Sequence, residues 1–224
     1  MMPKRKVVVF DLDDTLYKEI DYLQSAYHHI ASLVSNANAP EVEVYQHMLD
    51  TYRQGRKPFE AVIEKYRLQL YDVPWMLAVY RNHKPHIALD KSAEDTMDWL
   101  KAHGVVIGIV TDGRWTQQIH KVEALGLKRY VHEADVIINE AEECRKPDQR
   151  CFKHLMDKYG PDSDYWYVGD NPNKDFEGPN ALGWTTVCLR DDGRNIHPQH
   201  FDGPPSSLPK IIIDHLPDII PSLL

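Results

Sequence analysis

The sequence predicts an α/β protein in which a doubly wound parallel sheet is interrupted by an inserted α-helical domain. Runs of β-branched and aromatic residues alternate with helical stretches through most of the chain, and this alternation is typical of a parallel sheet with helices on its faces. The runs lack a polar alternation, as expected for strands buried on both faces. A segment from about Ile20 to Lys91 instead has apolar residues at helical spacing.

The predicted elements follow one another in a simple order. The first strand, Val7–Phe10, is followed at once by a cluster of acids. The helical segment comes next, with breaks near residues 36–40 and 55–58. The polar, proline-rich and glycine-rich stretch from Arg190 to Lys210 is expected to be a long surface loop with no clear chemistry. The other expected elements are helix Ala93–Lys101, strand Val105–Val110, helix Thr116–Leu125, apolar run Ala134–Ile138, helix Asp148–Tyr159, and strands Tyr165–Val168, Thr185–Leu189 and Ile211–Ile213.

Charge and hydropathy limit the partners and the compartment. The formal net charge is -8 and there is no long run of one sign, so a basic face for nucleic acid is not expected. An acidic chain can still bind an anionic substrate, because a bound metal reverses the local field. The basic residues Lys4–Lys6 precede only the short apolar run Val7–Phe10, which is too brief for a signal peptide or a membrane span. We therefore expect a cytoplasmic protein without a membrane partner; its oligomeric state is left open.

The cysteines give a second indication of the compartment. Cys144, Cys151 and Cys188 are odd in number and lack a CxxC spacing. This pattern favours reduced thiols in a cytosolic protein. No disulfide is therefore expected.

A pair of acids marks the end of the first predicted strand. Asp11 and Asp13 are separated by one residue, so their carboxylates are expected to emerge close together where the chain leaves the sheet. Magnesium is a natural partner for them, because it takes oxygen ligands from carboxylates and from substrate phosphate. Acids after a strand also cap helices or form turns, so this pair alone does not decide between the two interpretations.

Polar residues follow two further strands, and a lysine lies between them. Thr111 and Asp112 end the second strand, where a hydroxyl and successive backbone N–H groups could bind a phosphate. Lys146 precedes a helix and could stabilise a transferring phosphoryl group. Asp170 follows another strand, with Asp175 five residues later. Taken singly, the Thr111 loop is equally compatible with a plain helix N-cap, and Lys146 by itself favours a solvated surface lysine. Asp170 is expected as a third metal ligand.

The order of these motifs resembles the haloacid dehalogenase superfamily over nearly the whole chain. The resemblance lies in an apolar strand followed by DxDxT, a second strand followed by threonine, a lysine, and a third strand followed by GDxxxxD. It implies a Rossmann-like core of residues 1–17 and 91–224 and a helical cap of the family's first type over residues 18–90. The matching residues are Asp11, Asp13, Thr15, Thr111, Lys146, Asp170 and Asp175.

The resemblance also implies a role for each acid. Asp11 would be the nucleophile and Asp13 the general acid and base. Mg²⁺ would be held by Asp11, by the main-chain carbonyl of Asp13 and by Asp170. Asp175 would hold these ligands in position without binding the ion itself.

The resemblance places the phosphoryl group against other residues. Thr111 and Lys146 would bind it and take part in catalysis. Asp112 is expected to contribute to substrate binding from its place in the loop after Thr111, independently of the resemblance.

The expected function is therefore a magnesium-dependent phosphomonoester hydrolase with an aspartyl-phosphate intermediate and a small phosphorylated metabolite as substrate. The family's dehalogenases lack the second acid, so Asp13 favours phosphate esters. Two alternatives stay open: a phosphotransferase or phosphomutase that passes the group from Asp11 to an alcohol, and a non-catalytic binding module that keeps the fold. A non-catalytic module would be expected to lack an essential group, and all of the motif residues are present.

Overall fold

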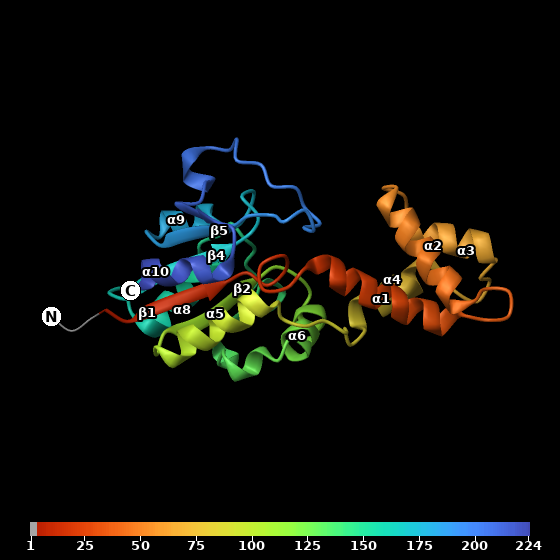
Figure 1. Cartoon of the computed structure of the whole chain (residues 1–224), viewed down its shortest axis with the longest axis horizontal. Helices are drawn as coiled ribbons and strands as arrows, with labels where there is room; N and C mark the ends of the chain where they lie inside the picture. Colours follow the sequence, from red (N-terminus) through yellow and green to blue (C-terminus); the bar gives the residue numbers. More distant parts are fainter. Residues whose placement is uncertain (1–3) are drawn as a thin grey trace. The chain divides into compact units, whose positions relative to one another are not determined.

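The chain divides into two compact units. The computed structural model describes residues 4–224, without the side chain of residue 142. One unit, the core unit, contains the chain up to Glu19 together with Ala88–Leu224, and the other, the helical unit, is Ile20–Ile87 (Figure 1). Within the described residues, no helix combines the length and the hydrophobicity that a membrane span requires.

The core unit is built on one parallel sheet. Within residues 4–224 the sheet has six strands in the order β3-β2-β1-β4-β5-β6, and every neighbouring pair is parallel. The predicted doubly wound parallel sheet is therefore confirmed. The strands are β1 (Lys6–Phe10), β2 (Val106–Thr111), β3 (Val136–Ile138), β4 (Asp164–Gly169), β5 (Thr185–Leu189) and β6 (Ile211–Ile213).

The strand order reverses between β1 and β4. Phe10, the last residue of β1, pairs with Val168 of β4 and with Ile109 of β2. The chain runs outward from β1 to β2 and β3 on one side, and to β4, β5 and β6 on the other. A reversal of this kind opens a crevice at the carboxyl ends of the central strands, where ligands bind in doubly wound folds.

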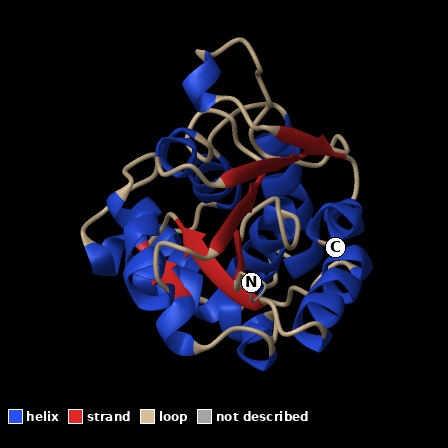
Figure 2. Cartoon of the chain, turned by 90° about the vertical axis from the view of Figure 1, so that its left-hand side faces the viewer, coloured by secondary structure: helices blue, strands red, loops and turns tan. Residues whose placement is uncertain are grey.

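Helices lie on either side of the strands in the core unit (Figure 2). Val7 and Val9 of β1 belong to a buried cluster that includes Phe152 and Leu155. Val8 and Phe10 are also fully buried, and alternate residues of a strand point to opposite faces. Both faces of β1 are therefore covered, which explains the unbroken apolar run. The helices are α5 (Lys91–Ala102), α6 (Trp115–Ala124), α7 (Asn139–Glu142), α8 (Arg150–Tyr159), α9 (Glu177–Ala181) and α10 (Ile220–Leu223).

The helical unit has its own apolar core. Aromatic side chains gather in it: the Tyr22 and Tyr80 rings meet edge to face at 5.4 Å between centroids, and Tyr27 contacts both Phe59 and Tyr80. The Tyr22 hydroxyl donates a hydrogen bond to the Tyr80 carbonyl at 2.8 Å, so its polar end is satisfied. The helices are α1 (Glu19–Val34), α2 (Glu41–Arg53), α3 (Pro58–Tyr66) and α4 (Val73–Asn82).

The predicted elements differ from the observed ones mainly at their ends. The run predicted from Ala134 becomes a 3-10 turn over Glu133–Asp135 followed by the short strand β3. The helix predicted from Asp148 begins at Arg150, because the Asp148 carboxylate accepts a hydrogen bond from the Arg150 backbone N–H at 2.8 Å. Aspartate side chains that bond the backbone in this way favour the start of a helix over its interior.

The expectation of three reduced thiols is wrong for two of the cysteines. Cys144 and Cys151 form a disulfide, with their Cα atoms 5.6 Å apart, whereas Cys188 is a buried free thiol. The spacing along the chain gave no indication of this pair, because disulfide formation depends on the distance between Cα atoms and on side-chain direction. The number and spacing of the cysteines therefore do not support the expected reducing compartment.

Candidate active site

Asp11 lies where the strand order reverses. Its backbone N–H donates to the Val168 carbonyl at 2.8 Å, which continues the pairing of β1 with β4 by one residue. The side chain is 1% exposed. One carboxylate oxygen, Oδ1, lies 2.8 Å from the Lys146 ammonium, while Oδ2 is buried and has no hydrogen-bond partner among the described residues. The carboxylate is therefore fixed at one oxygen and available at the other.

Lys146 is the buried cation of the site. Besides Asp11, its ammonium group contacts Asp175 Oδ1 at 2.7 Å and the Tyr167 hydroxyl at 3.0 Å, and the side chain is 0% exposed. Burial alone would lower the pKa of Lys146, but the carboxylates of Asp11 and Asp175 outweigh burial and raise it well above its ordinary value. Lys146 is therefore a permanent positive charge beside Asp11.

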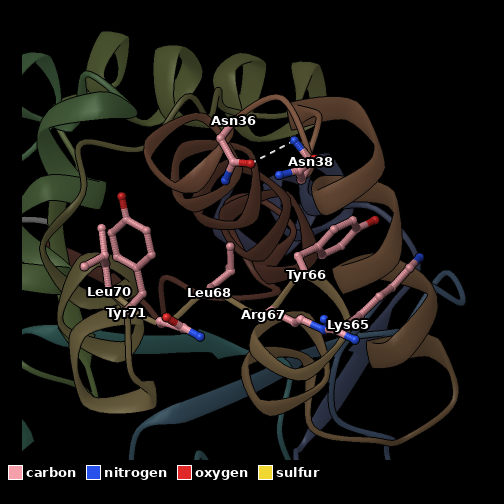
Figure 3. A pocket seen from close by; sticks show the side chains of 9 residues that line it. Asn36, Asn38, Lys65, Tyr66, Arg67, Leu68, Leu70 and Tyr71 are labelled. Carbon is pink, nitrogen blue, oxygen red and sulfur yellow. Dashed lines mark hydrogen bonds between the residues drawn. The ribbon is translucent and has the colours of Figure 1, made fainter.

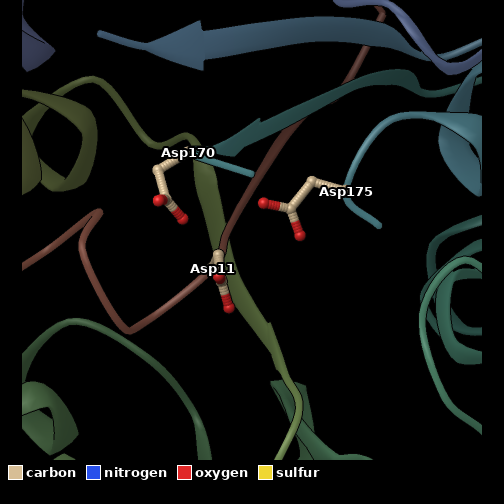
Figure 4. Close-up of side chains that lie close together, drawn as sticks. All are labelled: Asp11, Asp170 and Asp175. Carbon is tan, nitrogen blue, oxygen red and sulfur yellow. The ribbon is translucent and has the colours of Figure 1, made fainter. Parts of the chain in front are cut away.

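Three buried acids converge from two strand ends (Figure 4). Asp11, Asp170 and Asp175 each offer a carboxylate oxygen within 4.8 Å of the others. Both oxygens of Asp175 already accept hydrogen bonds, from Lys146 at 2.7 Å and from the Asn171 backbone N–H at 2.8 Å. Burial would raise the pKa of Asp175, but Lys146 and Lys174 lower it. Both oxygens of Asp175 are therefore already held by groups of this chain, and its supporting role for a metal stays a prediction.

The cluster has the chemistry of a site for a hard divalent cation. Its donors are carboxylate oxygens, which such cations prefer, and Asp11 Oδ2 is a buried polar atom for which the described residues supply no donor. Burial, together with the carboxylates of Asp175 and Asp11, raises the pKa of Asp170 to about 9. A cation would remove this repulsion. The residues present therefore fit a metal.

Asp13 points into a separate group of donors. The Lys121 ammonium contacts its two oxygens at 2.7 and 2.9 Å, and the Gln118 amide donates to Oδ2 at 3.0 Å. The Tyr17 hydroxyl donates to Oδ1. Burial alone would raise the pKa of Asp13, but the Lys121 charge and these hydrogen bonds lower it.

Thr111 and Asp112 end β2 and have different surroundings. The Thr111 hydroxyl accepts a hydrogen bond from Gln118 at 2.7 Å and so connects to Asp13. The Asp112 carboxylate accepts from the Asn139 amide at 2.9 Å and from the Lys146 backbone N–H at 3.2 Å. Asp112 therefore holds the segment that carries Lys146, and its contact with substrate stays a prediction.

Several residues of the site were missed by the sequence analysis. The sequence analysis placed Tyr167 in a strand, and Gln118 and Lys121 in a helix, without assigning them any chemistry. A lysine on the buried face of a helix needs a partner for its charge, and this signal could have indicated Lys121. Asn195 lies in the stretch that was expected to contribute no clear chemistry, yet its amide donates to Asp170 Oδ2 at 2.9 Å. The neighbouring Ile196 backbone N–H donates to Asp14 Oδ2 at 3.0 Å, which ties this stretch to the first motif.

The helical unit contains a hollow of about 530 Å³ (Figure 3). Lys65 and Arg67 lie on its rim and are exposed. Its lining holds no acidic residue and none of the predicted site residues, so it has no part in the acid cluster. The lining consists of Asn36, Asn38, Lys65, Tyr66, Arg67, Leu68, Gln69, Leu70 and Tyr71.

Comparison with protein families agrees with this geometry. The family model for haloacid dehalogenase-like hydrolases matches residues 5–183, most of the chain. The chain belongs to this family. The acid cluster, Lys146 and Thr111 of this haloacid dehalogenase-like hydrolase therefore lie within the matched region.

Curated relatives and solved structures resemble this hydrolase over most of its length. Glyceraldehyde 3-phosphate phosphatase of Methanopyrus kandleri is 26% identical, over 89% of this chain and 91% of the relative. The Methanocaldococcus jannaschii protein of the same name is 29% identical, over 82% of this chain and 84% of the relative. Among solved structures, the haloacid dehalogenase-type (HAD) hydrolase YfnB of Bacillus subtilis, bound to magnesium, has a TM-score of 0.65. It is 18% identical, and the match covers 99% of both chains. A HAD phosphatase from Thermococcus onnurineus has a TM-score of 0.60 at 21% identity, covering 97% of both chains.

These matches confirm the predicted family and the predicted fold class. They also confirm the predicted enzyme class, a phosphatase of this family.

Proposed function

We propose that this hydrolase is a magnesium-dependent phosphomonoesterase that transfers the phosphoryl group of a small metabolite first to Asp11 and then to water. The observation that carries the proposal is the state of the Asp11 carboxylate. Lys146 holds Oδ1 at 2.8 Å, and Oδ2 is buried with no hydrogen-bond partner within the described part of the chain. A buried oxygen of this kind is costly unless it binds a ligand. A phosphorus atom or a cation would be such a ligand.

The chain's own residues supply the steps of the proposed reaction. The Asp11 carboxylate attacks phosphorus while the bond to the leaving oxygen breaks, and Asp13 gives that oxygen a proton. Water then attacks the aspartyl-phosphate, its proton passes to Asp13, and Asp11 is released. Lys146 offsets the negative charge that gathers during both transfers.

Magnesium would occupy the acid cluster. Asp11, Asp170 and the main-chain carbonyl of Asp13 would hold the ion, with Asp175 positioned behind them by Lys146 and Asn171. When bound, Mg²⁺ would reduce the repulsion between the anionic nucleophile and the anionic phosphate.

The names of the relatives support a small substrate. Two relatives that align with most of this chain, from Methanopyrus kandleri and Methanocaldococcus jannaschii, are named glyceraldehyde 3-phosphate phosphatase. We therefore place three-carbon phosphate esters first among the candidates. We also propose that the helical unit acts as the cap predicted for residues 18–90 and selects the leaving group.

The test is phosphate release by the purified protein, with and without Mg²⁺. A panel of phosphorylated metabolites that includes glyceraldehyde 3-phosphate, plus p-nitrophenyl phosphate, would be compared for wild type and Asp11→Asn. The expected result is release that chelation abolishes, and that Asp11→Asn lowers by about a thousandfold or more, as for other lost nucleophiles. The matched control is Asp162→Asn, a change at an exposed aspartate, which should behave as wild type.

Two outcomes would contradict the proposal. Release that persists in Asp11→Asn would exclude an aspartyl-phosphate on this residue. Transfer of phosphate to an added alcohol in preference to water would identify a phosphotransferase.

A further inference from the structure

Lys121 is a buried lysine that the family motifs do not include. It lies on α6 and is 1% exposed. Its ammonium group contacts both carboxylate oxygens of Asp13, at 2.7 and 2.9 Å. Burying a lysine costs free energy, and an apolar pair often stabilises a core as well as an ion pair does. The intact pair therefore adds little net stability over an apolar pair, and its position against Asp13 points to a role in the chemistry of that acid.

Gln118 holds Asp13 from the same face of α6. Residues three apart on a helix are neighbours, and the Gln118 amide donates to Asp13 Oδ2 at 3.0 Å and to the Thr111 hydroxyl at 2.7 Å. A single side chain thus links the end of β2 with the acid that follows β1.

A glycine makes room for Gln118. Gly113 has φ +150°, and a Cβ there would lie 2.8 Å from two carbon atoms of the Gln118 side chain. Such a distance is closer than packed atoms allow, so any larger residue would push Gln118 away from its position.

We propose that Lys121 and Gln118 are positioning residues that hold the carboxyl group of Asp13 in place for its two proton transfers. The inference rests on the proposed function, in which Asp13 gives a proton to the leaving oxygen and takes one from the attacking water. Neither residue touches the reacting atoms in this scheme. They act through Asp13, and a displacement of about 1 Å at such a group can cost about a hundredfold in rate.

The test is a double-mutant cycle between Lys121→Met and Asp13→Asn in the full-length protein with Mg²⁺. With an alkyl phosphate, Lys121→Met should lower kcat by about 10-fold to 100-fold and change KM by less than about threefold. In the Asp13→Asn background the same change should alter kcat by less than about twofold, because residues that act as a unit are not additive. All four proteins are measured with the same alkyl phosphate, because a double-mutant cycle compares one reaction in two backgrounds.

Companion variants separate positioning from folding. Lys121→Arg keeps a donor and should recover part of the loss, and Gln118→Met should resemble Lys121→Met in a milder form. Lys128→Met removes the exposed lysine that pairs with Glu123 at 2.9 Å and should leave kcat unchanged. Urea unfolding of each variant shows whether it is folded under the assay conditions.

The outcomes distinguish this inference from the proposed function. Equal losses in both backgrounds, or a loss confined to KM, would overturn the positioning role in an active enzyme. If wild type releases no phosphate, the proposed function fails, and a crystal structure of Lys121→Met still decides the inference. An Asp13 carboxylate displaced from Gln118 supports it, and an unmoved carboxylate overturns it.

Discussion

Buried charges dominate the site at the scale of single residues. Asp11, Asp175 and Lys146 are each at most 3% exposed and contact one another. An isolated buried charge is strongly destabilising, so these three residues depend on one another. Asp13, whose side chain is 16% exposed, contacts the buried Lys121. The trio and this pair fix the carboxylates of Asp11 and Asp13 separately.

Glu19 provides a test of this electrostatic environment. Burial first, and then the carboxylate of Asp13, raise the pKa of Glu19 from 4.5 to about 8, with Asp14 adding to the shift and Lys121 and Lys174 opposing it. The folded state therefore binds a proton more tightly than the unfolded state. Hence the free energy of unfolding should fall as pH rises from about 4.5 to 8, with a slope for this group of at most about 1.4 kcal/mol per pH unit.

The measurement is urea unfolding of metal-free protein at pH 5.5 and 7.5. Glu19→Gln should reduce the difference in unfolding free energy between these pH values by on the order of 1 kcal/mol, since it removes the titrating group. Glu64→Gln, at an exposed position in α3, is the control and should keep the wild-type difference. An unchanged pH dependence in Glu19→Gln would show that Glu19 ionises normally in the folded state.

Among the secondary-structure elements, the ends of the strands and the segments that follow them determine where the site residues lie. Asp11 follows β1 and Asp170 follows β4, and these strands are neighbours where the sheet order reverses. The segment between α7 and α8 carries Lys146, and the Cys144–Cys151 disulfide closes it. The backbone N–H of Lys146 bonds to Asp112 after β2. Three strand ends thus hold the groups of one cluster.

Gly169 at the end of β4 packs closely against Asp175. A Cβ at this position would lie 2.6 Å from Asp175 Oδ2, so Gly169→Ala should displace Asp175 from Lys146 and from the Asn171 N–H. We expect a loss of about 10-fold to 100-fold in Mg²⁺ affinity or kcat, as is typical when a group that orients metal ligands is moved. Isothermal titration with Mg²⁺ and steady-state kinetics would measure the two quantities.

A second glycine in the sheet serves as the comparison. In Gly108→Ala the new Cβ would meet the end of the Leu155 side chain at 3.2 Å, which can shift by rotation. Gly108→Ala should therefore keep the Mg²⁺ affinity. If Gly169→Ala also keeps it, Asp175 has no supporting role for the metal ligands.

The two units have separate cores at the scale of the whole molecule. The core unit packs around the parallel sheet, and the helical unit packs around aromatic and aliphatic side chains of α1–α4. Met48 is fully buried within the helical unit, whereas Leu70 is 91% exposed. A substitution at the buried Met48 can therefore change the stability of the helical unit alone, and a substitution at the exposed Leu70 can serve as its control.

Met48→Ala should therefore destabilise the helical unit by about 2–5 kcal/mol, the usual cost of deleting a buried side chain of this size. Hydrogen exchange followed by mass spectrometry should show loss of protection in α1–α4, while peptides from β1 and β4 keep theirs. Leu70→Ala is the control and should change neither. Equal loss of protection in both units would mean that the chain unfolds as one cooperative body.

The sequence by itself determined the class of fold and most of the acid cluster. Apolar runs identify strands buried on both faces, and the residues after these runs lie at one edge of a parallel sheet. Asp11, Asp170 and Asp175 could therefore be predicted as neighbours from local patterns, and Lys146 from its resemblance to a family motif. Helix ends were less accurate, because side chains such as Asp148 compete for backbone hydrogen bonds.

Only the tertiary structure decided which partners these groups have. Lys121 lies 108 residues from Asp13 and contacts it directly, Asn195 reaches Asp170 from a stretch that was expected to lack chemistry, and Cys144 pairs with Cys151. Local patterns report the period and polarity of an element, and they carry no information on which buried side chain of one element meets which of another. That choice depends on distances of a few ångströms in the packed core, where each buried charge must find its counter-charge.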